Sequence, residues 1–427
     1  MRTPPTGVTR RQVLGTTAAM ATLPILERLR SRRDGEQPNI VLILADDLGI
    51  ETLGCYGGES WETPRLDAMA AAGIRFEHAF STPLCAPSRA QLMSGRYPFH
   101  TKIDRDRIYE ARGAIDFDPA LGTLAICLRD AGYDTGVFGK WHLASLNRSP
   151  HHPQACGFEE SVCFRAKELY WDAEILRNGK ILGKTKGQFA PDIYHRAVLD
   201  FVRAERDRPF FAYYPMQLPH APLTRVPGLE ETNDERELFA AMLRYLDSQV
   251  GGLLDAVSAK DSSRDTVVMF TSDNGTASDV RSKWRGRDVR GGKNSLRDAG
   301  IRVPLIVLAP GHVEAGRVSD ALVDLSDFLP TLGDLGRVPA DKRPQGDGQS
   351  FAPVLAGAPG AREWIYAQLG DAFCIRDQHW KYSSNGRFLS VEAPGNERVD
   401  LRESGDPDVV AARERLAGAA KELRGEG

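Results

Sequence analysis

Short runs of apolar residues alternate with amphipathic segments along most of the chain. Residues 39–45, 210–215 and 266–271 are mostly apolar over the length of a strand, which is typical of strands covered on both faces. Residues 235–257 carry apolar side chains at helical spacing instead. Strands that alternate with helices predict an α/β protein, with a large, mostly parallel sheet flanked by helices on both faces.

Capping signals add further elements to this pattern. Thr63 and Pro64 are typical of a helix start, and we expect that helix to reach Ala72 and to end at Gly73. Similar reasoning predicts strands at 74–80, 133–138 and 303–309 and a helix at 123–131.

A stretch rich in glycine and proline at 357–361 indicates a boundary. Beyond it, short segments have the spacing of a small antiparallel sheet, followed by a helix from about Asp408. The segments are residues 364–369, 372–376, 379–384 and 387–391. We therefore predict a main α/β domain at 36–357 and a small C-terminal α+β subdomain at 358–427.

The first 35 residues are typical of a targeting segment. Arg10 and Arg11 form an arginine pair, and a weakly apolar run follows to Leu23. This resembles a twin-arginine export signal, and predicts a periplasmic or secreted protein with residues 1–35 as signal and linker. A disordered basic tail is the alternative.

Composition narrows the remaining choices. The 427 residues carry a net charge of −3, which gives no reason to expect a nucleic acid or an anionic membrane as partner. No apolar run is long enough for an ordinary membrane span. Six cysteines fit an exported protein with one or two disulfides, although Cys127 lies on an apolar helix face and is expected to be a buried thiol. The oligomeric state stays open.

Acidic side chains follow two of the predicted strands at the point where each strand ends. Asp46 and Asp47 follow the first strand, and Asp273 and Asn274 follow residues 266–271. In open α/β sheets, ligands gather beyond the carboxyl ends of strands. Carboxylates that meet there repel one another unless a cation lies between them, and an all-oxygen set suits Ca²⁺ or Mg²⁺ better than Zn²⁺. The alternative is that each of them is a loop carboxylate that caps a helix.

Residues 84–96, Leu-Cys-Ala-Pro-Ser-Arg-Ala-Gln-Leu-Met-Ser-Gly-Arg, predict a short helix that begins next to Cys85. Pro87 suits the first turn and Gly95 suits the end. The positive end of the helix dipole, together with Arg89 one turn on, predicts a reactive or chemically modified thiol. Taken alone, such a cysteine is more often a small core residue.

Cys-x-Pro-Ser-Arg followed by Leu-x-Ser-Gly-Arg resembles the signature of the sulfatases, with Ser94 in place of the family's Thr. The resemblance implies the alkaline-phosphatase-like fold, and oxidation of Cys85 to formylglycine by a maturation enzyme. The blocks 45–47 and 272–275 resemble the family's metal ligands. By this match Asp46, Asp47, Asp273, Asn274 and the modified Cys85 bind Ca²⁺, with Mg²⁺ as the alternative ion.

Three further blocks resemble the same family: Gly139-Lys140-Trp141-His142, Pro219-His220-Ala221-Pro222 and Gly291-Gly292-Lys293. The resemblance implies that Lys140 and Arg89 hold the sulfate and that Lys293 bridges sulfate and leaving group. It also implies that His142 contacts the hydrated aldehyde and acts as a base, and that His220 donates a proton to the leaving oxygen.

The expected activity is hydrolysis of a sulfate ester on a carbohydrate or a small molecule. One alternative is a phosphodiesterase or phosphonate monoester hydrolase of the same superfamily, and another is a non-catalytic protein that binds sulfated glycans. The loops expected to select the substrate are 104–118, 144–190 and 222–236. Arginines in these loops either meet acidic sugars or are solvated surface: Arg105, Arg107, Arg112 and Arg148.

Overall fold

The computed structural model describes residues 36–110, 113–166, 168–183, 185–260, 264–391 and 399–425. The predicted export signal at 1–35 lies outside the described residues. Within them, no helix combines the length and the apolar character that crossing a membrane requires.

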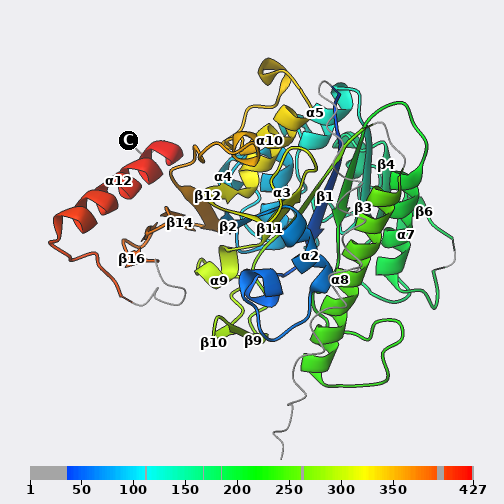
Figure 1. The fold of residues 1–427 in the computed structure, drawn as a ribbon, viewed down its shortest axis with the longest axis horizontal. Helices are drawn as coiled ribbons and strands as arrows, with labels where there is room; N and C mark the ends of the chain where they lie inside the picture. The colour runs from blue at the N-terminus through cyan, green and yellow to red at the C-terminus, as the bar shows by residue number, and fades with distance from the viewer. Residues whose placement is uncertain are drawn as a thin grey trace, which may run out of the picture.

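One ten-stranded sheet organises the molecule (Figure 1). Its strand order is β12 (Arg317–Asp324), β2 (Ile74–Phe80), β11 (Leu305–Leu308), β8 (Thr266–Ser272), β1 (Asn39–Ala45), β7 (Phe210–Pro215), β3 (Asp134–Gly139), β4 (Glu160–Phe164), β5 (Ile175–Arg177) and β6 (Lys180–Ile181). The five central strands from β8 to β4 are parallel. The three apolar runs seen in the sequence are the middle of this sheet, which confirms the predicted fold class.

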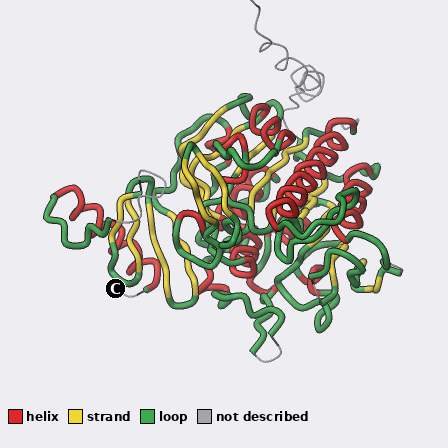
Figure 2. The backbone as a smooth tube through the Cα atoms, turned by 90° about the horizontal axis from the view of Figure 1, so that it is seen from below, coloured by secondary structure: helices red, strands yellow, loops and turns green. Residues whose placement is uncertain are grey.

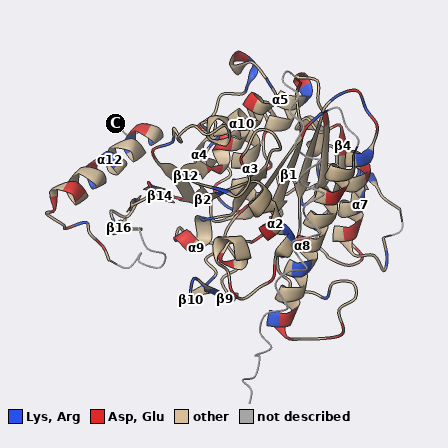
Figure 3. Cartoon of the chain, in the orientation of Figure 1, with Lys and Arg blue, Asp and Glu red and all other residues tan. Residues whose placement is uncertain are grey.

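The central strand β1 shows why helices cover both faces of the sheet. Its alternate residues enter two separate cores, with Leu42 in one and Ile43 in the other. The first core includes side chains of α3 (Cys85–Ser94), α5 (Leu124–Asp130) and α10 (Phe328–Leu335). The second includes side chains of α2 (Pro64–Ala72), α7 (Ala190–Arg203) and α8 (Glu235–Ala259). Figure 3 accordingly shows the sheet largely free of charged residues, which lie on helices and loops.

The C-terminal part forms a second sheet that stands apart from the first (Figure 2). Its four antiparallel strands are β13 (Ile365–Leu369), β14 (Ala372–Arg376), β15 (Trp380–Ser383) and β16 (Phe388–Ser390), and α12 (Pro407–Arg424) packs against them. Phe80 and Leu322 of the main body share an apolar cluster with Ile365 and Cys374 of this sheet. The predicted antiparallel sheet and terminal helix are confirmed.

Other elements depart from the expectations. The segment 144–190 is not one long loop, because α6 (His152–Ala155), β4, β5 and β6 lie within it. A hairpin of β9 (Arg281–Trp284) and β10 (Arg287–Arg290) was also not expected. The remaining short helices are α4 (Pro98–Thr101), α9 (Asp298–Ile301) and α11 (Ala352–Leu355).

The expected disulfides are wrong. All six cysteines are free thiols, and five of them, including Cys127, are buried. Cys127, Cys156 and Cys163 lie in one apolar cluster and Cys374 lies in another, where each packs as a small hydrophobic side chain, whereas Cys85 lies outside both.

Candidate active site

The ends of two neighbouring strands bring the predicted acidic residues together. β1 and β8 run parallel with Ala45 opposite Ser272, so the residues that follow both strands emerge at the same edge of the sheet. The backbone N–H of Asp47 donates to Oδ1 of Asp273 at 3.2 Å, and Nδ2 of Asn274 donates to Oδ1 of Asp47 at 2.7 Å. Asp46, Asp47, Asp273 and Asn274 therefore form one buried group, as the sequence predicted.

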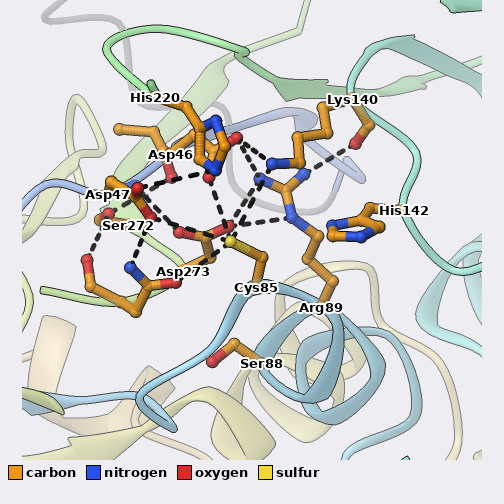
Figure 4. Close-up of polar contacts among 12 residues, drawn as sticks. Asp46, Asp47, Cys85, Ser88, Arg89, Lys140, His142, His220, Ser272 and Asp273 are labelled. Atoms are coloured by element: carbon orange, nitrogen blue, oxygen red, sulfur yellow. Dashed lines mark hydrogen bonds and ion pairs between the residues drawn. The ribbon is translucent and has the colours of Figure 1, made fainter. Parts of the chain in front are cut away.

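Cys85 is the first residue of α3 and points its thiol into this group (Figure 4). Its Sγ lies 3.3 Å from Oδ1 of Asp46, 3.3 Å from Oδ1 of Asn274 and 3.8 Å from Oδ1 of Asp47. The side chain is only 1% exposed. The thiol thus faces oxygen atoms on several sides in a site closed to bulk solvent.

Arg89 follows one turn later on α3 and is fully buried. Its Nε and Nη2 donate to Oδ2 of Asp273 at 3.0 and 2.7 Å, and its Nη1 donates to the carbonyl of Lys140 at 2.7 Å. All three nitrogens are therefore engaged within the protein, and Arg89 holds Asp273 rather than an open anion site.

Lys140 enters the group from the end of β3. Gly139 precedes it with φ of 131°, and a Cβ at that position would lie 2.0 Å from the carbonyl oxygen of Pro215, so only glycine fits. Lys140 Nζ lies 2.5 Å from Oδ2 of Asp46, 3.0 Å from Oε1 of Glu168 and 4.0 Å from Sγ of Cys85. The lysine charge is thus placed beside the thiol and Asp46.

His220 and Lys293 lie on the solvent side of the same group. Lys293 Nζ donates to Asp47 at 2.7 Å, and Nε2 of His220 lies 3.7 Å from Oδ2 of Asp47. The side chain of Lys293 is 20% exposed and that of His220 is 21% exposed, in contrast to the buried residues beneath them. Both line an open pocket that Arg105, Asp106 and Arg107 also line. These two residues therefore face an incoming molecule.

The donor set fits a divalent cation. One ligand atom each from Asp46, Asp47, Cys85 and His220 lies within 4.8 Å of the others. Asn274 adds an oxygen that faces the thiol. Oδ2 of Asp46 is buried and accepts no hydrogen bond from the described residues, so it is held only by ion pairs. Buried carboxylate and amide oxygens are the ligands that Ca²⁺ and Mg²⁺ prefer.

Asp273 is also predicted as a metal ligand, but it is not one of the four residues whose ligand atoms lie within 4.8 Å of one another. Its Oδ2 accepts from Arg89 and its Oδ1 accepts the backbone N–H of Asp47, and each carboxylate oxygen keeps a further lone pair for a cation, so Asp273 stays a predicted ligand. Glu51, which follows the first acidic pair, is also outside the set. Its Oε1 accepts a hydrogen bond from Oγ1 of Thr276 at 2.5 Å.

The electrostatics of the group contradict a reactive thiol. Burial and the carboxylates of Asp273 and Asp46 raise the pKa of Cys85 well above its ordinary value. The helix terminus and Arg89 suggested the opposite, but Arg89 is neutralised by Asp273. In the folded protein the thiol is therefore protonated and a poor nucleophile.

The cationic side chains stay charged. Burial acts to lower the pKa of Lys140 and of Lys293, but the surrounding carboxylates, Asp46 foremost for Lys140, raise both pKa values above the ordinary range. For Asp46, burial acts to raise the pKa, yet Lys140, His220 and Arg89 hold it well below the usual value. Asp46 is thus a carboxylate beside the ammonium of Lys140 and the guanidinium of Arg89.

Three residues stand apart from the predicted picture. His142 makes no hydrogen bond or ion pair with the cluster drawn in Figure 4, and its Nε2 lies 3.0 Å from Oδ1 of Asp106 instead. Glu168, in the segment expected to be a loop, joins Lys140 to Nδ1 of His220, which lies 3.6 Å away. No sequence pattern indicates Asp106 or Glu168, because isolated acidic residues in loops match no motif.

Comparisons with known proteins agree with this geometry. The family model described as Sulfatase matches residues 38–338. N-acetylgalactosamine-6-sulfatase of Rattus norvegicus is 32% identical over 372 residues, which are 79% of this chain and 70% of the relative. Arylsulfatase A of Homo sapiens is 32% identical over 381 residues, which are 81% of this chain and 74% of the relative.

Solved structures share the fold. The crystal structure of Ps i-CgsB in complex with k-i-k-neocarrahexaose has a TM-score of 0.76 and 26% identity, and covers 90% of this chain and 93% of that chain. The phosphonate monoester hydrolase of Agrobacterium radiobacter has a TM-score of 0.63 at 21% identity, over 91% of this chain and 96% of that one, which shows a shared fold only. On the family match and the relatives at 32% identity, the chain belongs to the sulfatase family of sulfuric ester hydrolases.

Proposed function

We propose that the protein hydrolyses a sulfate ester on a carbohydrate, with a formylglycine derived from Cys85 and a divalent cation, Ca²⁺ in the first place. The observation that carries the proposal is the convergence of the Cys85 thiol with Asp46, Asp47 and Asn274 at the ends of two parallel strands. Two relatives support the substrate class. One is named N-acetylgalactosamine-6-sulfatase, and a similar solved structure contains a neocarrahexaose.

In the proposed centre, formylglycine and the divalent cation supply part of the chemistry, and the side chains of the protein supply the rest. Formylglycine as its hydrate supplies a hydroxyl that attacks sulfur and an aldehyde that releases sulfate, and the divalent cation supplies positive charge for both. Asp46, Asp47, Asp273 and Asn274 would hold this cation. His220 is close enough to join them and is more exposed, so we assign it to the substrate side.

The chain's own cations bind the sulfate group. Lys140 and Lys293 now face Asp46 and Asp47, and both ammonium groups become available to sulfate oxygens once those carboxylates face a divalent cation. Positioned charges of this kind stabilise the transition state because they need no reorganisation during the reaction. Arg89 acts beneath them, since it holds Asp273 and the backbone of Lys140 in place.

His220 is placed to act on the leaving oxygen. It lines the open pocket beside Lys293, with Asp47 on one ring nitrogen and Glu168 on the other. As the bond between sulfur and the ester oxygen breaks, His220 gives its proton to that oxygen and the alcohol departs. Water supplies the oxygen and the proton that complete hydrolysis, so the products are the free alcohol and hydrogen sulfate.

Export and maturation are coupled in this proposal. The arginine pair at Arg10 and Arg11 supports export by the twin-arginine route, which moves folded proteins. Cys85 is 1% exposed, so a maturation enzyme reaches it only before folding. Conversion to formylglycine therefore precedes export, and cells without the maturation enzyme should export a folded, inactive protein to the periplasm or medium.

Mass spectrometry of the peptide that contains Cys85 tests the proposal directly. Protein made with a maturation enzyme should carry an aldehyde at position 85 and hydrolyse aryl sulfates and sulfated sugars. Protein made without the maturation enzyme should carry a thiol and hydrolyse neither. Full activity of the thiol form, or faster hydrolysis of aryl phosphonates than of aryl sulfates by the aldehyde form, would contradict it.

A further inference from the structure

His142 has an acidic partner that no sequence motif indicated. Its Nε2 lies 3.0 Å from Oδ1 of Asp106, and its ring stacks on Tyr109 with 5.0 Å between ring centres and 8° between ring planes. His142 is 3% exposed as a whole residue. Its backbone has φ of 50°, a region that residues other than glycine rarely adopt. The ring is therefore held by the carboxylate, the tyrosine and its own backbone.

The loop that carries Asp106 is anchored on both sides. Ile103 and Ile108 are buried in the main apolar core. The carbonyl of Asp104 accepts a hydrogen bond from the N–H of Gly370 at 3.0 Å, and the carbonyl of Ile108 accepts one from Arg148 at 2.9 Å. Asp106 thus reaches His142 from a fixed backbone and not from a freely moving loop.

We propose that Asp106 is a positioning residue that keeps the proton of His142 on Nε2, so that Nδ1 carries the lone pair and acts as the base of the sulfatase reaction. A carboxylate accepts a hydrogen bond but donates none, so it selects the tautomer with the proton on the nitrogen that it faces. Nδ1 is buried and has no hydrogen-bond partner among the described residues. The inference rests on the proposed function, because it assigns an atom to the base in that reaction.

The charges around His142 favour its neutral form. Burial lowers the pKa of His142, the carboxylates of Asp106 and Glu168 act to raise it, and the ammonium of Lys140 acts to lower it. Tyr109 covers the ring without adding a charge near neutral pH, because a phenol hydroxyl stays protonated there. The hydrogen bond from His142 and the nearby ammonium charges of Lys140 and Lys293 outweigh the effect of burial and lower the pKa of Asp106 to about 2. A neutral imidazole beside an ionised carboxylate is the state that the proposal requires.

Nitrogen NMR of the histidine side chains tests the tautomer without turnover. In the mature protein near neutral pH, the His142 signal, identified by its loss in His142→Gln, should show the proton on Nε2. In Asp106→Asn it should shift towards a mixture, since an amide can donate as well as accept. A wild-type signal with the proton on Nδ1 would overturn the proposal. This outcome is independent of whether position 85 holds an aldehyde, so it is separable from failure of the proposed function.

Kinetic measurements distinguish a role of Asp106 in positioning His142 from a role in supporting the local structure alone. Asp106→Asn should lower kcat about 10- to 100-fold, and should move the acid limb of the kcat profile to lower pH, because the carboxylate that raises the His142 pKa is lost. Asp106→Glu should restore part of kcat, and Asp104→Asn, in the same anchored loop, should leave the profile unchanged. If Asp106→Asn does not fold, the wild-type tautomer and the pH dependence of kcat in Asp106→Glu still decide whether Asp106 positions His142. A normal tautomer and an unmoved acid limb in the Asp106 variants would contradict the proposal.

Discussion

Two buried arginines in this molecule each lie between two aspartates, and the two clusters differ in how completely their polar atoms are satisfied. In the Arg362 cluster, Arg362 contacts Asp324 and Asp327. Both oxygens of Asp324 and both of Asp327 accept further hydrogen bonds, from the hydroxyl of Tyr97, from Gln91 and from backbone N–H groups. All four carboxylate oxygens of this cluster are thus satisfied, and the cluster ties the chain after residue 357 to the main body.

The active-site cluster around Arg89 is incomplete by comparison. Buried atoms there without a hydrogen bond among the described residues include Oδ2 of Asp46, Oε1 of Glu168, Nδ1 of His220 and Nδ1 of His142. Native proteins pair nearly all buried polar atoms, so a concentration of exceptions indicates a place prepared for something else. The buried charges of the Arg362 cluster therefore do not by themselves mark a functional site, whereas the concentration of unpaired buried atoms around Cys85 supports one.

The prediction with the largest expected effect tests whether the active-site cluster, unlike the Arg362 cluster, is required for activity. Cys85→Ala should reduce kcat for sulfate ester hydrolysis by about 10⁴-fold or more, since removal of a nucleophile removes the reaction path. Its free energy of unfolding should change little, because the thiol fills a polar centre and contributes little to either apolar core. Steady-state kinetics and urea denaturation measure both quantities. Cys127→Ala is the control, with unchanged kcat and a modest loss of stability, and appreciable turnover by Cys85→Ala would refute the role of position 85.

A second change tests the exposed side of the active-site cluster. His220→Ala should lower kcat by about 10² to 10⁴-fold for alkyl sulfates, which need a proton on the leaving oxygen. The loss should be much smaller for 4-nitrophenyl sulfate, because its leaving group is stable as an anion. His312→Ala, an exposed histidine, is the control and should leave both rates unchanged. An equal loss for both substrates would show that His220 does not act as the proton donor.

The Arg362 cluster should respond in the opposite way. Arg362→Ala should lower the free energy of unfolding by about 3–5 kcal/mol, because it leaves two buried carboxylates without their cation. At a temperature where the variant stays folded, kcat should be unchanged. Arg129→Ala, which breaks an exposed pair with Asp130, should cost no more than about 1 kcal/mol. Loss of activity without loss of stability in Arg362→Ala would remove the distinction between the clusters.

The smallest effect is expected for the pH dependence of stability at Asp247, a buried carboxylate whose hydrogen-bond donors are backbone N–H groups and not a guanidinium. Asp247 accepts the N–H groups of Arg65 and Leu66 at the start of α2, and burial raises its pKa to about 6. The folded state therefore binds more protons than the unfolded state, whose aspartate pKa is about 3.9. The stabilisation from this group is present below pH 4 and is lost as the pH rises towards 6.

Denaturation at several pH values checks this sign. The free energy of unfolding of the wild type, relative to Asp247→Asn, should fall between about pH 4 and pH 6. A relative stability that rises over this interval would show that Asp247 is held ionised in the folded protein.

The fold and the buried acidic residues of the active site could be predicted from the sequence because local patterns determine both. Asp46 and Asp273 directly follow strongly apolar strands, so local patterns place them at the same edge of a parallel sheet. The helix over 64–72 has the predicted bounds because Pro64 and Gly73 mark its ends locally. The family resemblance supplied the remaining site residues, since their positions in the chain are far apart.

The features that were missed depend on long-range contacts or on weak patterns. Asp106 and Glu168 act through His142 and Lys140, which are distant in sequence, and nothing next to them signals the contact. β6 has only two residues and both are exposed, so no alternation is visible. The reactivity of Cys85 was mispredicted because the helix terminus is a local feature, whereas the carboxylates that raise its pKa come from β1 and β8.

Metal analysis of the purified mature protein tests the central claim most directly, namely that the incomplete cluster is prepared for a divalent cation. Wild-type protein dialysed against metal-free buffer should retain about one Ca²⁺ per chain, with Mg²⁺ as the alternative ion. Asp47→Ala should lose this ion, and Arg362→Ala, measured while folded, should keep it. An active wild-type protein that holds no divalent cation, or an Asp47→Ala protein that binds the cation as tightly as the wild type, would contradict the assignment.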